Sequence, residues 1–298
     1  MTESFTLHRT LFPRLHLAEV EDQSWCPPWL REHTHKALSR TWRLPISRTL
    51  GSPAEQACSV LIDQLGGLQR ASEYTYVDAC AGAGGPTPHI EHRMNELLRQ
   101  RGLGEADFVL TDLWPDVEAW KGIVRANPQG RVRYVEQPVD ATKAVRIVGK
   151  GQGKECRMFN LSFHHFDDPV AEQVLESAVA SADAFVIFEL THRTLPALLN
   201  TTFIILSPFI TTLRDFWWSP MYLLLTYIIP IIPLFYFIDG YVSCARGRTA
   251  NETWRLLTRR SGLTLREWEQ KNGWDIKSGQ QLVIPPFGTL YWYVGVKR

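Results

Sequence analysis

Tyr76-Val77-Asp78-Ala79-Cys80-Ala81-Gly82-Ala83-Gly84-Gly85-Pro86-Thr87-Pro88 is the stretch that decides the fold. A β-rich run from Tyr74 to Val77 ends in a carboxylate, a glycine-rich turn follows, and a helical stretch extends from about Pro88 to Arg101. Small residues let the backbone approach a ligand closely, and a helix start offers free N–H groups and a partial positive charge. A strand, a glycine turn and a helix in this order predict a nucleotide-cofactor site in a βαβ unit.

The spacing within this stretch is Asp-x-Cys-x-Gly-x-Gly, followed at once by a second Gly. It is not Gly-x-Gly-x-x-Gly, so a dinucleotide is not the first choice, and it lacks the Gly-Lys-Ser/Thr ending of a Walker-type phosphate loop. A tight glycine turn in some other α/β domain is the alternative without a cofactor.

Composition narrows the class of protein. The 298 residues are 45% hydrophobic and 21% charged, as in a globular chain with an ample core. The net charge of +1 gives no global basic field, so nucleic acid is not an expected partner. The five cysteines are odd in number and lack a Cys-x-x-Cys pair, which favours a reducing, intracellular compartment. They are Cys26, Cys58, Cys80, Cys156 and Cys244. Met1 to Leu17 has no apolar core of a secretory signal.

Strand-like and helix-like segments alternate after the glycine turn. Helical segments fill the gaps between the strands, notably Pro169 to Ser181, and this alternation predicts a parallel, doubly wound sheet. The further expected strands are 108–112, 132–136, 157–162 and 184–189.

Carboxylates close these strands or lie just past them. They are Asp78, Asp112, Asp140 and Glu189. Each one alone is typical of a helix N-cap or a turn. Because ligands of such sheets bind beyond the carboxyl ends of the strands, the four together predict a ligand site where charge-assisted hydrogen bonds hold ribose hydroxyls or an adenine amine.

The glycine stretch resembles motif I of the class I S-adenosylmethionine-dependent methyltransferases, whose usual form is acidic-x-Gly-x-Gly-x-Gly. Cys80 stands in place of the first Gly. The chain from Ala71 to Arg298 is similar to a little-characterised group of these enzymes that has an apolar stretch between the fifth and sixth strands. The matching segments are Val77 to Pro86, Phe163-His164-His165-Phe166 and Asp239-Gly240-Tyr241-Val242-Ser243.

The resemblance implies a Rossmann-like, seven-stranded sheet with helices on both faces, and S-adenosyl-L-methionine as the cofactor. It places the ribose at Asp112 and the adenine at Asp140. The cofactor-binding residues expected in this way are Asp78, Cys80, Gly82, Gly84, Gly85, Asp112, Asp140 and Ser162.

His164 and His165 follow the fourth strand, where enzymes of this kind bring the cofactor sulfur and the acceptor together. They are the candidate catalytic residues, since a histidine can take a proton from a hydroxyl near neutral pH. The alternative is a structural role in packing or capping. No zinc ligand set accompanies the pair in the sequence, so no metal is expected. The candidate substrate-binding residues are Trp25, Trp29, Glu189 and Asp239.

The N-terminal region has Trp25 and Trp29 on either side of Pro27-Pro28, followed by helices expected from about Leu30 to Trp42 and Pro53 to Leu68. Pro-Pro stops regular structure. This segment is either a lid over a substrate pocket or an arm packed on the domain.

Leu195 to Ile238 is an apolar insertion, interrupted by Arg214-Asp215 and by several prolines. Three readings stay open: two legs across a bilayer, a hairpin that dips into one leaflet, and a buried cap over an apolar pocket. All three predict a lipophilic acceptor.

The chain is then expected to end with a helix from Thr249 to about Arg260, a sixth strand at Leu263 to Glu269 and a seventh at Thr289 to Val296. Asp239 is expected either in a turn beside Gly240 or lining the pocket. The predicted domains are an N-terminal helical arm or lid (1–70), a cofactor-binding α/β core (71–194), the apolar insertion (195–242) and a C-terminal helix with strands (243–298).

These observations predict S-adenosylmethionine-dependent methyl transfer to a lipophilic small molecule, a secondary metabolite or a lipid, in the cytoplasm or on the cytoplasmic face of a membrane. The alternatives are a cyclase or isomerase on the same fold and a non-enzymatic, membrane-associated binding protein. The sequence does not indicate an oligomeric state.

Overall fold

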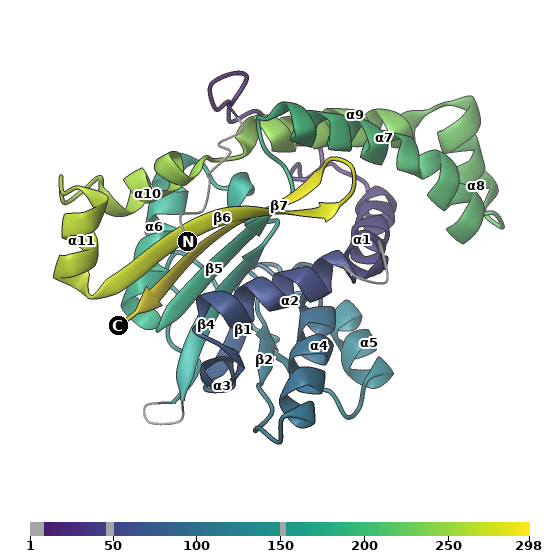
Figure 1. The fold of residues 1–298 in the computed structure, drawn as a ribbon. Helices are drawn as coiled ribbons and strands as arrows, with labels where there is room; N and C mark the ends of the chain where they lie inside the picture. The colour runs from purple at the N-terminus through teal and green to yellow at the C-terminus, as the bar shows by residue number, and fades with distance from the viewer. Residues whose placement is uncertain (1–8, 46–50, 150–152) are drawn as a thin grey trace.

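A computed structural model describes residues 9–45, 51–149 and 153–298 (Figure 1). Residues 1–8 and 46–50 of the predicted N-terminal arm and residues 150–152 of the predicted core lie outside these ranges. Seven strands form one sheet in the order β3-β2-β1-β4-β5-β7-β6. Strands β1 to β5 pair in parallel, whereas β7 runs antiparallel to both β5 and β6. The predicted α/β fold class, with an antiparallel hairpin completing the sheet, is therefore confirmed.

The strand bounds agree with the expected positions for six of the seven strands. The strands are β1 (Tyr74–Asp78), β2 (Phe108–Leu110), β3 (Val132–Tyr134), β4 (Lys154–Asn160), β5 (Ala184–Glu189), β6 (Trp274–Ile284) and β7 (Gly288–Lys297). The helices outside the insertion are α1 (Pro28–Arg43), α2 (Pro53–Gln64), α3 (Leu68–Ala71), α4 (Thr87–Gln100), α5 (Val117–Ala126), α6 (Asp168–Ser181), α10 (Ala250–Thr258) and α11 (Leu265–Asn272), with a 3-10 turn, η1 (Phe163–His165).

Alternate residues of the central strands face two separate cores. Met158 and Val186 pack in one core with apolar side chains of α2 and α4. Phe159 and Ile187 pack in the other with side chains of α6 and α10. Because successive strand residues point to opposite faces, the sheet is covered on both sides, as its near-continuous apolar strands require.

The sixth strand was predicted at the wrong place. Leu263 to Glu269 falls largely in α11, whose N-cap is Thr264 and whose C-cap Gly273 has a left-handed conformation. Thr264 and Glu267 form a capping box, in which each side chain binds the other residue's backbone N–H. The strand β6 begins after that glycine, at Trp274. The Thr264-x-x-Glu267 pattern favours the start of a helix, and this preference is stronger than the strand preference of the few apolar residues in the segment.

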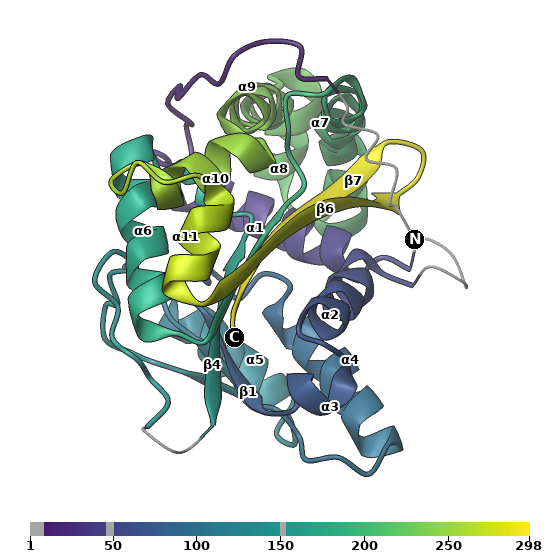
Figure 2. The same cartoon turned by 60° about the vertical axis from the view of Figure 1, so that its left-hand side comes forward.

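The apolar insertion folds into helices that project beyond the edge of the sheet. They are α7 (Leu195–Asp215), α8 (Pro220–Leu223), the π-helical turn η2 (Leu224–Ile228) and α9 (Ile231–Arg246). Figure 2 shows α7 and α9 side by side, nearly end-on. Asp239 and Gly240 lie inside α9, so the predicted turn at Asp239 is wrong. Helical packing of α9 on α7 continues through Gly240, where a Cβ would approach the Thr201 side chain to 2.9 Å.

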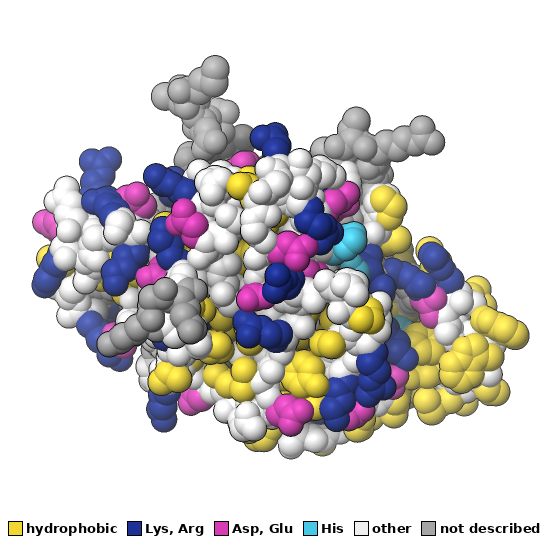
Figure 3. All heavy atoms as spheres, turned by 90° about the horizontal axis from the view of Figure 1, so that it is seen from below, with side chains coloured by type: hydrophobic (Ala, Val, Ile, Leu, Met, Phe, Trp, Pro, Cys, Tyr) yellow, Lys and Arg dark blue, Asp and Glu magenta, His cyan; other side chains and the backbone are white. Residues whose placement is uncertain are grey.

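Much of the insertion's apolar surface is exposed. Helix α7 is long and apolar enough to cross a membrane. Only 28% of its apolar 18-residue stretch is buried inside the protein. The helical segments Pro220–Ile228 and Ile231–Arg246 are together long and apolar enough for one broken membrane span, which is bent by 67°. Figure 3 shows apolar side chains gathered on the projecting end, at the right. A core helix would be mostly buried, so low burial argues against the buried-cap reading.

Helix α1 covers one side of this projection. Leu30 of α1 belongs to the same apolar cluster as Phe216, Tyr222 and Phe235 of the insertion. Arg40 of α1 forms an ion pair with Asp215, at the end of α7. Charged residues of α1 therefore lie along the insertion out to its tip.

His33 lies at the centre of this contact and is fully buried. Its ring stacks on Phe216 at 5.0 Å, its Nδ1 is 3.0 Å from the Tyr236 hydroxyl, and its Nε2 has no partner among the described residues. Burial lowers the pKa of His33 from its ordinary 6.5 to about 4.

The folded state binds a proton at His33 more weakly than the unfolded state does. The contribution of the neutral His33 ring to the free energy of unfolding is therefore complete above pH 6.5 and is lost as the pH falls towards 4. The expected loss is up to about 3 kcal/mol, at about 1.4 kcal/mol per pKa unit. Urea unfolding of the wild type and of His33→Phe at several pH values measures it. Burial raises the pKa of Asp239 to about 6, so Asp239 makes the folded state more stable as the pH falls, opposite to His33. The effect of His33 is therefore read from the difference in unfolding free energy between the wild type and His33→Phe. An identical pH dependence would contradict the assignment to His33.

Candidate cofactor and acceptor site

The glycine turn is held in a fixed, open shape. Gly82 and Gly85 have φ of 49° and 44°, in the left-handed region, and a Cβ at either would meet nothing within 4 Å. The Gly82 N–H donates to Asp112 Oδ2 at 2.8 Å, and its carbonyl accepts from Trp120 Nε1 at 2.8 Å. Gly84 faces inward, since a Cβ there would lie 2.4 Å from Ile123. The turn therefore presents bare backbone to a ligand.

The two carboxylates expected to hold ribose and adenine lie next to each other along the sheet edge. Asp112 accepts the N–H groups of Gly82 and Trp114 at 2.8 and 2.9 Å. The Val139 N–H donates to the Asp112 carbonyl at 2.8 Å, which brings Asp140 beside it. The Thr142 hydroxyl and N–H both donate to Asp140 Oδ1, at 2.7 and 2.9 Å, and the hydroxyl bond is the main cause that lowers the pKa of Asp140. Both carboxylates are thus oriented by short-range hydrogen bonds.

Asp78 ends β1 and is almost completely buried. Its Oδ2 accepts from the Thr87 hydroxyl at 2.5 Å and from Asn160 Nδ2 at 3.0 Å, while its Oδ1 has no hydrogen-bond partner of normal geometry among the described residues. The backbone N–H of Cys80 lies close enough to lower the pKa of this carboxyl. Asn160 Oδ1 is likewise buried without a partner in the described part of the chain. Burial raises the pKa of Asp78 to about 6. Two orphaned acceptors side by side suit a ligand group that donates hydrogen bonds and carries positive charge.

Cys80 occupies the position of the first motif glycine, at the start of the turn. Burial raises the pKa of its thiol far above the ordinary range, and the charges of Asp112, Asp78 and Asp140 add to the effect. The three carboxylates therefore lie near enough to this thiol to act on its charge, as expected for residues that follow neighbouring parallel strands. Ser162, also expected at the cofactor, is half-buried directly before η1.

A hollow of about 390 Å³ adjoins the outer side of the same turn. It is lined by Ala83 and Gly85 of the turn and by side chains of α1, α4 and α5, including Arg43, His89 and Ile123. Asp78, Asp112 and Asp140 are not part of its lining, so we assign it no role in cofactor binding.

His164 is oriented by Glu189, which ends β5. Glu189 Oε2 lies 2.7 Å from His164 Nδ1, and Glu189 Oε1 accepts the His164 backbone N–H at 3.0 Å. Both residues are buried. In a neutral ring held in this way, Nδ1–H donates to the carboxylate and Nε2 carries the lone pair. Nε2 has no hydrogen-bond partner among the described residues. Glu189, expected at the substrate, therefore positions the histidine.

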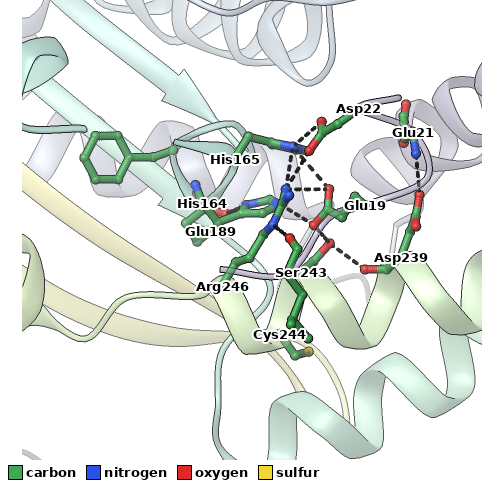
Figure 4. Close-up of polar contacts among 12 residues, drawn as sticks. Glu19, Glu21, Asp22, His164, His165, Glu189, Asp239, Ser243, Cys244 and Arg246 are labelled. Atoms are coloured by element: carbon green, nitrogen blue, oxygen red, sulfur yellow. Dashed lines mark hydrogen bonds and ion pairs between the residues drawn. The ribbon is translucent and has the colours of Figure 1, made fainter. Parts of the chain in front are cut away.

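His165 points to the N-terminal segment instead (Figure 4). Its Nδ1 lies 2.9 Å from Asp22 Oδ1 and 3.2 Å from Glu19 Oε2. Burial alone would lower the pKa of His165, but Asp22 and Glu19 raise it to about 9. Arg246 of α9 also donates to Asp22 Oδ2, at 2.7 Å. The second histidine is therefore charged at neutral pH and ties η1 to the segment that covers it.

The remaining candidate substrate residues have other neighbours. Trp25 is 68% exposed. The ring of Trp29 lies edge-on to Tyr222 of the insertion at 6.0 Å. Asp239 accepts the backbone N–H groups of Val20 and Glu21 at 2.7 and 2.8 Å, so it anchors the N-terminal segment. The structure thus brings His164 and Glu189 together but not these three residues.

Sequence reasoning missed several residues of the site. Asn160 had a signal, since an amide is the last residue of the buried strand β4. Glu19 and Arg246 had none, because each meets the histidines only through tertiary contacts.

No family model matches the chain, and no curated protein matches it. Solved structures with a similar fold do exist, among them methyltransferases. Magnesium protoporphyrin IX methyltransferase from Synechocystis PCC 6803, with bound S-adenosylhomocysteine, shares 12% identity at a TM-score of 0.45, over 82% of this chain and 83% of that chain. An S-adenosylmethionine-dependent methyltransferase from Anabaena variabilis ATCC 29413 shares 13% identity at a TM-score of 0.44, over 97% and 100%. These likenesses concern the fold alone.

Proposed function

We propose that this protein transfers a methyl group from S-adenosylmethionine to a lipophilic small molecule at a membrane surface. The single observation that carries the proposal is the pair of orphaned acceptors, Asp78 Oδ1 and Asn160 Oδ1, beside an open glycine turn. The α-ammonium group of the cofactor would supply donors and positive charge to these atoms.

Asp112 and Asp140 would receive the rest of the cofactor. Asp112 is oriented by the turn itself and has lone pairs left for ribose hydroxyls, since a carboxylate offers about four acceptor sites. Asp140 lies beside it, where the adenine amine would be in reach. The cofactor would supply the methyl group as a sulfonium substituent, and the residues of the chain would orient it.

His164 would face the acceptor. Its Nε2 is buried and held in one direction by Glu189, at the edge of the sheet where the glycine turn also lies. In a displacement at a sulfonium, alignment of the acceptor matters as much as removal of its proton.

The acceptor is proposed to be lipophilic because the insertion exposes a wide apolar surface. Its exposed side chains include Phe203, Ile210, Leu213, Trp217, Trp218, Ile228 and Phe237. On a monomeric soluble protein such a patch is an interaction site. A secondary metabolite or a lipid dissolved in a bilayer would be presented to a protein that rests on it.

We place the insertion in the plane of one leaflet, on the cytoplasmic face of a membrane, rather than across it. Lys36 lies over the Phe216 ring at 5.5 Å, and Arg40 pairs with Asp215. Two crossing legs with this tip on the far side would draw the earlier turns of α1, with Arg31 and Glu32, through the hydrocarbon, at about 2.5 to 3.5 kcal/mol for each charged side chain near the centre. An in-plane position leaves them at the headgroups, where Trp217 and Trp218 also favour a site.

Replacing Ile210, Trp217 and Trp218 together by serine is expected to abolish binding to lipid vesicles. Each of these large apolar side chains is more than half exposed, and its transfer into lipid is worth about 1.5 kcal/mol. The loss of all three should lower the partition coefficient by at least about 100-fold. Flotation of the protein with phosphatidylcholine and phosphatidylglycerol vesicles measures it.

The matched control is Val145→Ser, since Val145 is 77% exposed but lies between β3 and β4, away from the insertion. This variant should float like the wild type. A wild-type protein that stays at the bottom of the gradient would reject membrane association.

The proposed reaction is tested by incubating the purified protein and a membrane-lipid extract with methyl-labelled S-adenosylmethionine. The label is expected in the organic phase, together with an equal amount of S-adenosylhomocysteine. Calorimetry of cofactor binding is done in parallel. Failure to bind the cofactor would reject the proposal, whereas binding without any transfer would favour a cyclase, an isomerase or a binding protein.

A further inference from the structure

Four separate parts of the chain meet at the two histidines. Glu19 and Asp22 come from the N-terminal segment, His164 and His165 from η1, Glu189 from β5, and Ser243 and Arg246 from α9 (Figure 4). Glu19 is 2% exposed and His164 is 4% exposed. A carboxylate and an imidazole enclosed to this degree need a partner that offsets the loss of water.

The donor atoms converge on one point. Glu19 Oε1 lies 3.8 Å from His164 Nε2, and Glu19 Oε2 lies 3.2 Å from His165 Nδ1. One ligand atom from each of the three residues lies within 4.8 Å of the others. Ligands about 2.1 Å from a tetrahedral ion are about 3.5 Å apart, so a small inward shift of these side chains would complete the coordination.

His164 is held as metal-binding histidines are held. Its Nδ1 is bound to the Glu189 carboxylate at 2.7 Å, which fixes the ring and its tautomer. Its Nε2 is buried, lacks a hydrogen-bond partner among the described residues and faces Glu19. A carboxylate behind the ligating imidazole is the usual outer support of such a site. Ser243 supports Glu19 in the same way, since its hydroxyl donates to Oε1 at 2.8 Å.

We propose that Glu19, His164 and His165 bind a divalent transition-metal ion of the zinc or iron(II) kind, with a fourth position left open and with loss of the Nδ1 proton of His165 on binding. Imidazole and carboxylate together are ligands that these ions prefer. The metal site does not depend on the proposed function. If both hold, the ion lies where the acceptor is proposed to bind and holds the acceptor oxygen, and His164 then acts through the ion rather than as a free base.

Arg246 is the charge that opposes this assignment. Its guanidinium lies 3.3 Å from Glu19 Oε2 and 3.4 Å from His165 Nδ1. The nitrogen in both contacts, Nη1, also donates to Asp22 Oδ2 at 2.7 Å, and Nε donates to the Leu17 carbonyl at 2.5 Å. With the ion bound, Nη1 moves away from Glu19 Oε2 and His165 Nδ1, and Arg246 keeps its contacts with Leu17 and Asp22. The competing arrangement is a metal-free network in which Arg246 neutralises Glu19 and Asp22.

The test uses the full chain, stripped of metal by a chelator, and cobalt(II) as the probe. We expect one equivalent of cobalt to bind with the visible absorption of a four-coordinate ion, and zinc to displace it. Zinc at about 100 times its dissociation constant should raise the melting temperature by about 5 °C or more. A wild-type protein without stoichiometric cobalt or zinc binding would overturn the proposal.

Variants identify the ligands. Glu19→Gln and His164→Gln should weaken metal binding by about 100-fold or more, and Glu189→Gln by about 10- to 100-fold. His165→Asn tests the cluster at a half-exposed position, should Glu19→Gln not fold. The matched control is Glu21→Gln, because Glu21 lies on the same segment but pairs with His35. Cobalt binding by Glu19→Gln and His165→Asn as tight as that of Glu21→Gln would overturn the assignment.

Cofactor affinity is measured on the same preparations. Loss of metal binding with intact binding of S-adenosylmethionine would overturn only the metal site. Intact metal binding without cofactor affinity would instead overturn only the proposed function.

Discussion

Replacing Asp112 by asparagine is expected to weaken the binding of S-adenosylmethionine by about 100-fold, which corresponds to about 2.7 kcal/mol. The carboxylate accepts the N–H groups of Gly82 and Trp114 on different oxygens, and it is proposed to accept ribose hydroxyls as well. Asparagine has one acceptor oxygen in place of two, so it would lose either the hydrogen bonds to the ribose hydroxyls or one of the hydrogen bonds from the backbone N–H groups. Charge-assisted hydrogen bonds of this kind contribute about 1.5 to 3 kcal/mol. Isothermal calorimetry measures the affinity.

The control for this variant is Asp116→Asn, which makes the same change close by in the chain. Asp116 is the N-cap of α5, where its side chain accepts the Ala119 N–H at 3.1 Å. Asparagine caps helices as well as aspartate, so both stability and cofactor affinity should be retained. A folded Asp112→Asn protein with the affinity of the wild type would remove Asp112 from the site.

Replacing His164 by glutamine is expected to lower the turnover number by about 100- to 10,000-fold while leaving cofactor affinity unchanged. His164 faces the acceptor side, and its contacts are with Glu189 and Glu19 rather than with the glycine turn. The effect should therefore appear in kcat and not in the dissociation constant of the cofactor. The label-transfer reaction and calorimetry give the two quantities separately.

Glu189 and His164 should act as one unit. The double variant Glu189→Gln with His164→Gln is expected to lose no more activity than His164→Gln alone, because the carboxylate acts through the imidazole. His192→Gln is the control, since His192 is equally buried but stacks on Tyr291 at 4.4 Å. Full activity in folded His164→Gln would leave this histidine with a packing role only.

Local signals in the sequence were sufficient for the cofactor half of the site. Asp78 and the glycine turn are neighbours along the chain, and Asp112 follows a strand that pairs with β1. Parallel strands end at the same edge of a sheet. Residues that directly follow such strands therefore lie close together, and this does not depend on how the surrounding helices pack. Where a local signal was overlooked, as at the Thr264 capping box, a strand was expected in place of a helix.

The insertion could not be assigned from its composition, because an apolar side chain is equally suited to a protein core and to lipid. Only the fold shows that α1 covers one side of it and that Ile210 and Trp217 stay exposed on the rest.

By itself, then, the sequence determined the five parallel strands of the sheet, the glycine turn and the row of carboxylates at the strand ends, since these follow from short-range periodicity and strand order. The tertiary structure alone decided that Glu19 lies against His164 and His165 and that Asp239 anchors the segment carrying Glu19. Such contacts join segments far apart in the chain. They depend on how helices and loops pack, and no local pattern of residues encodes that packing.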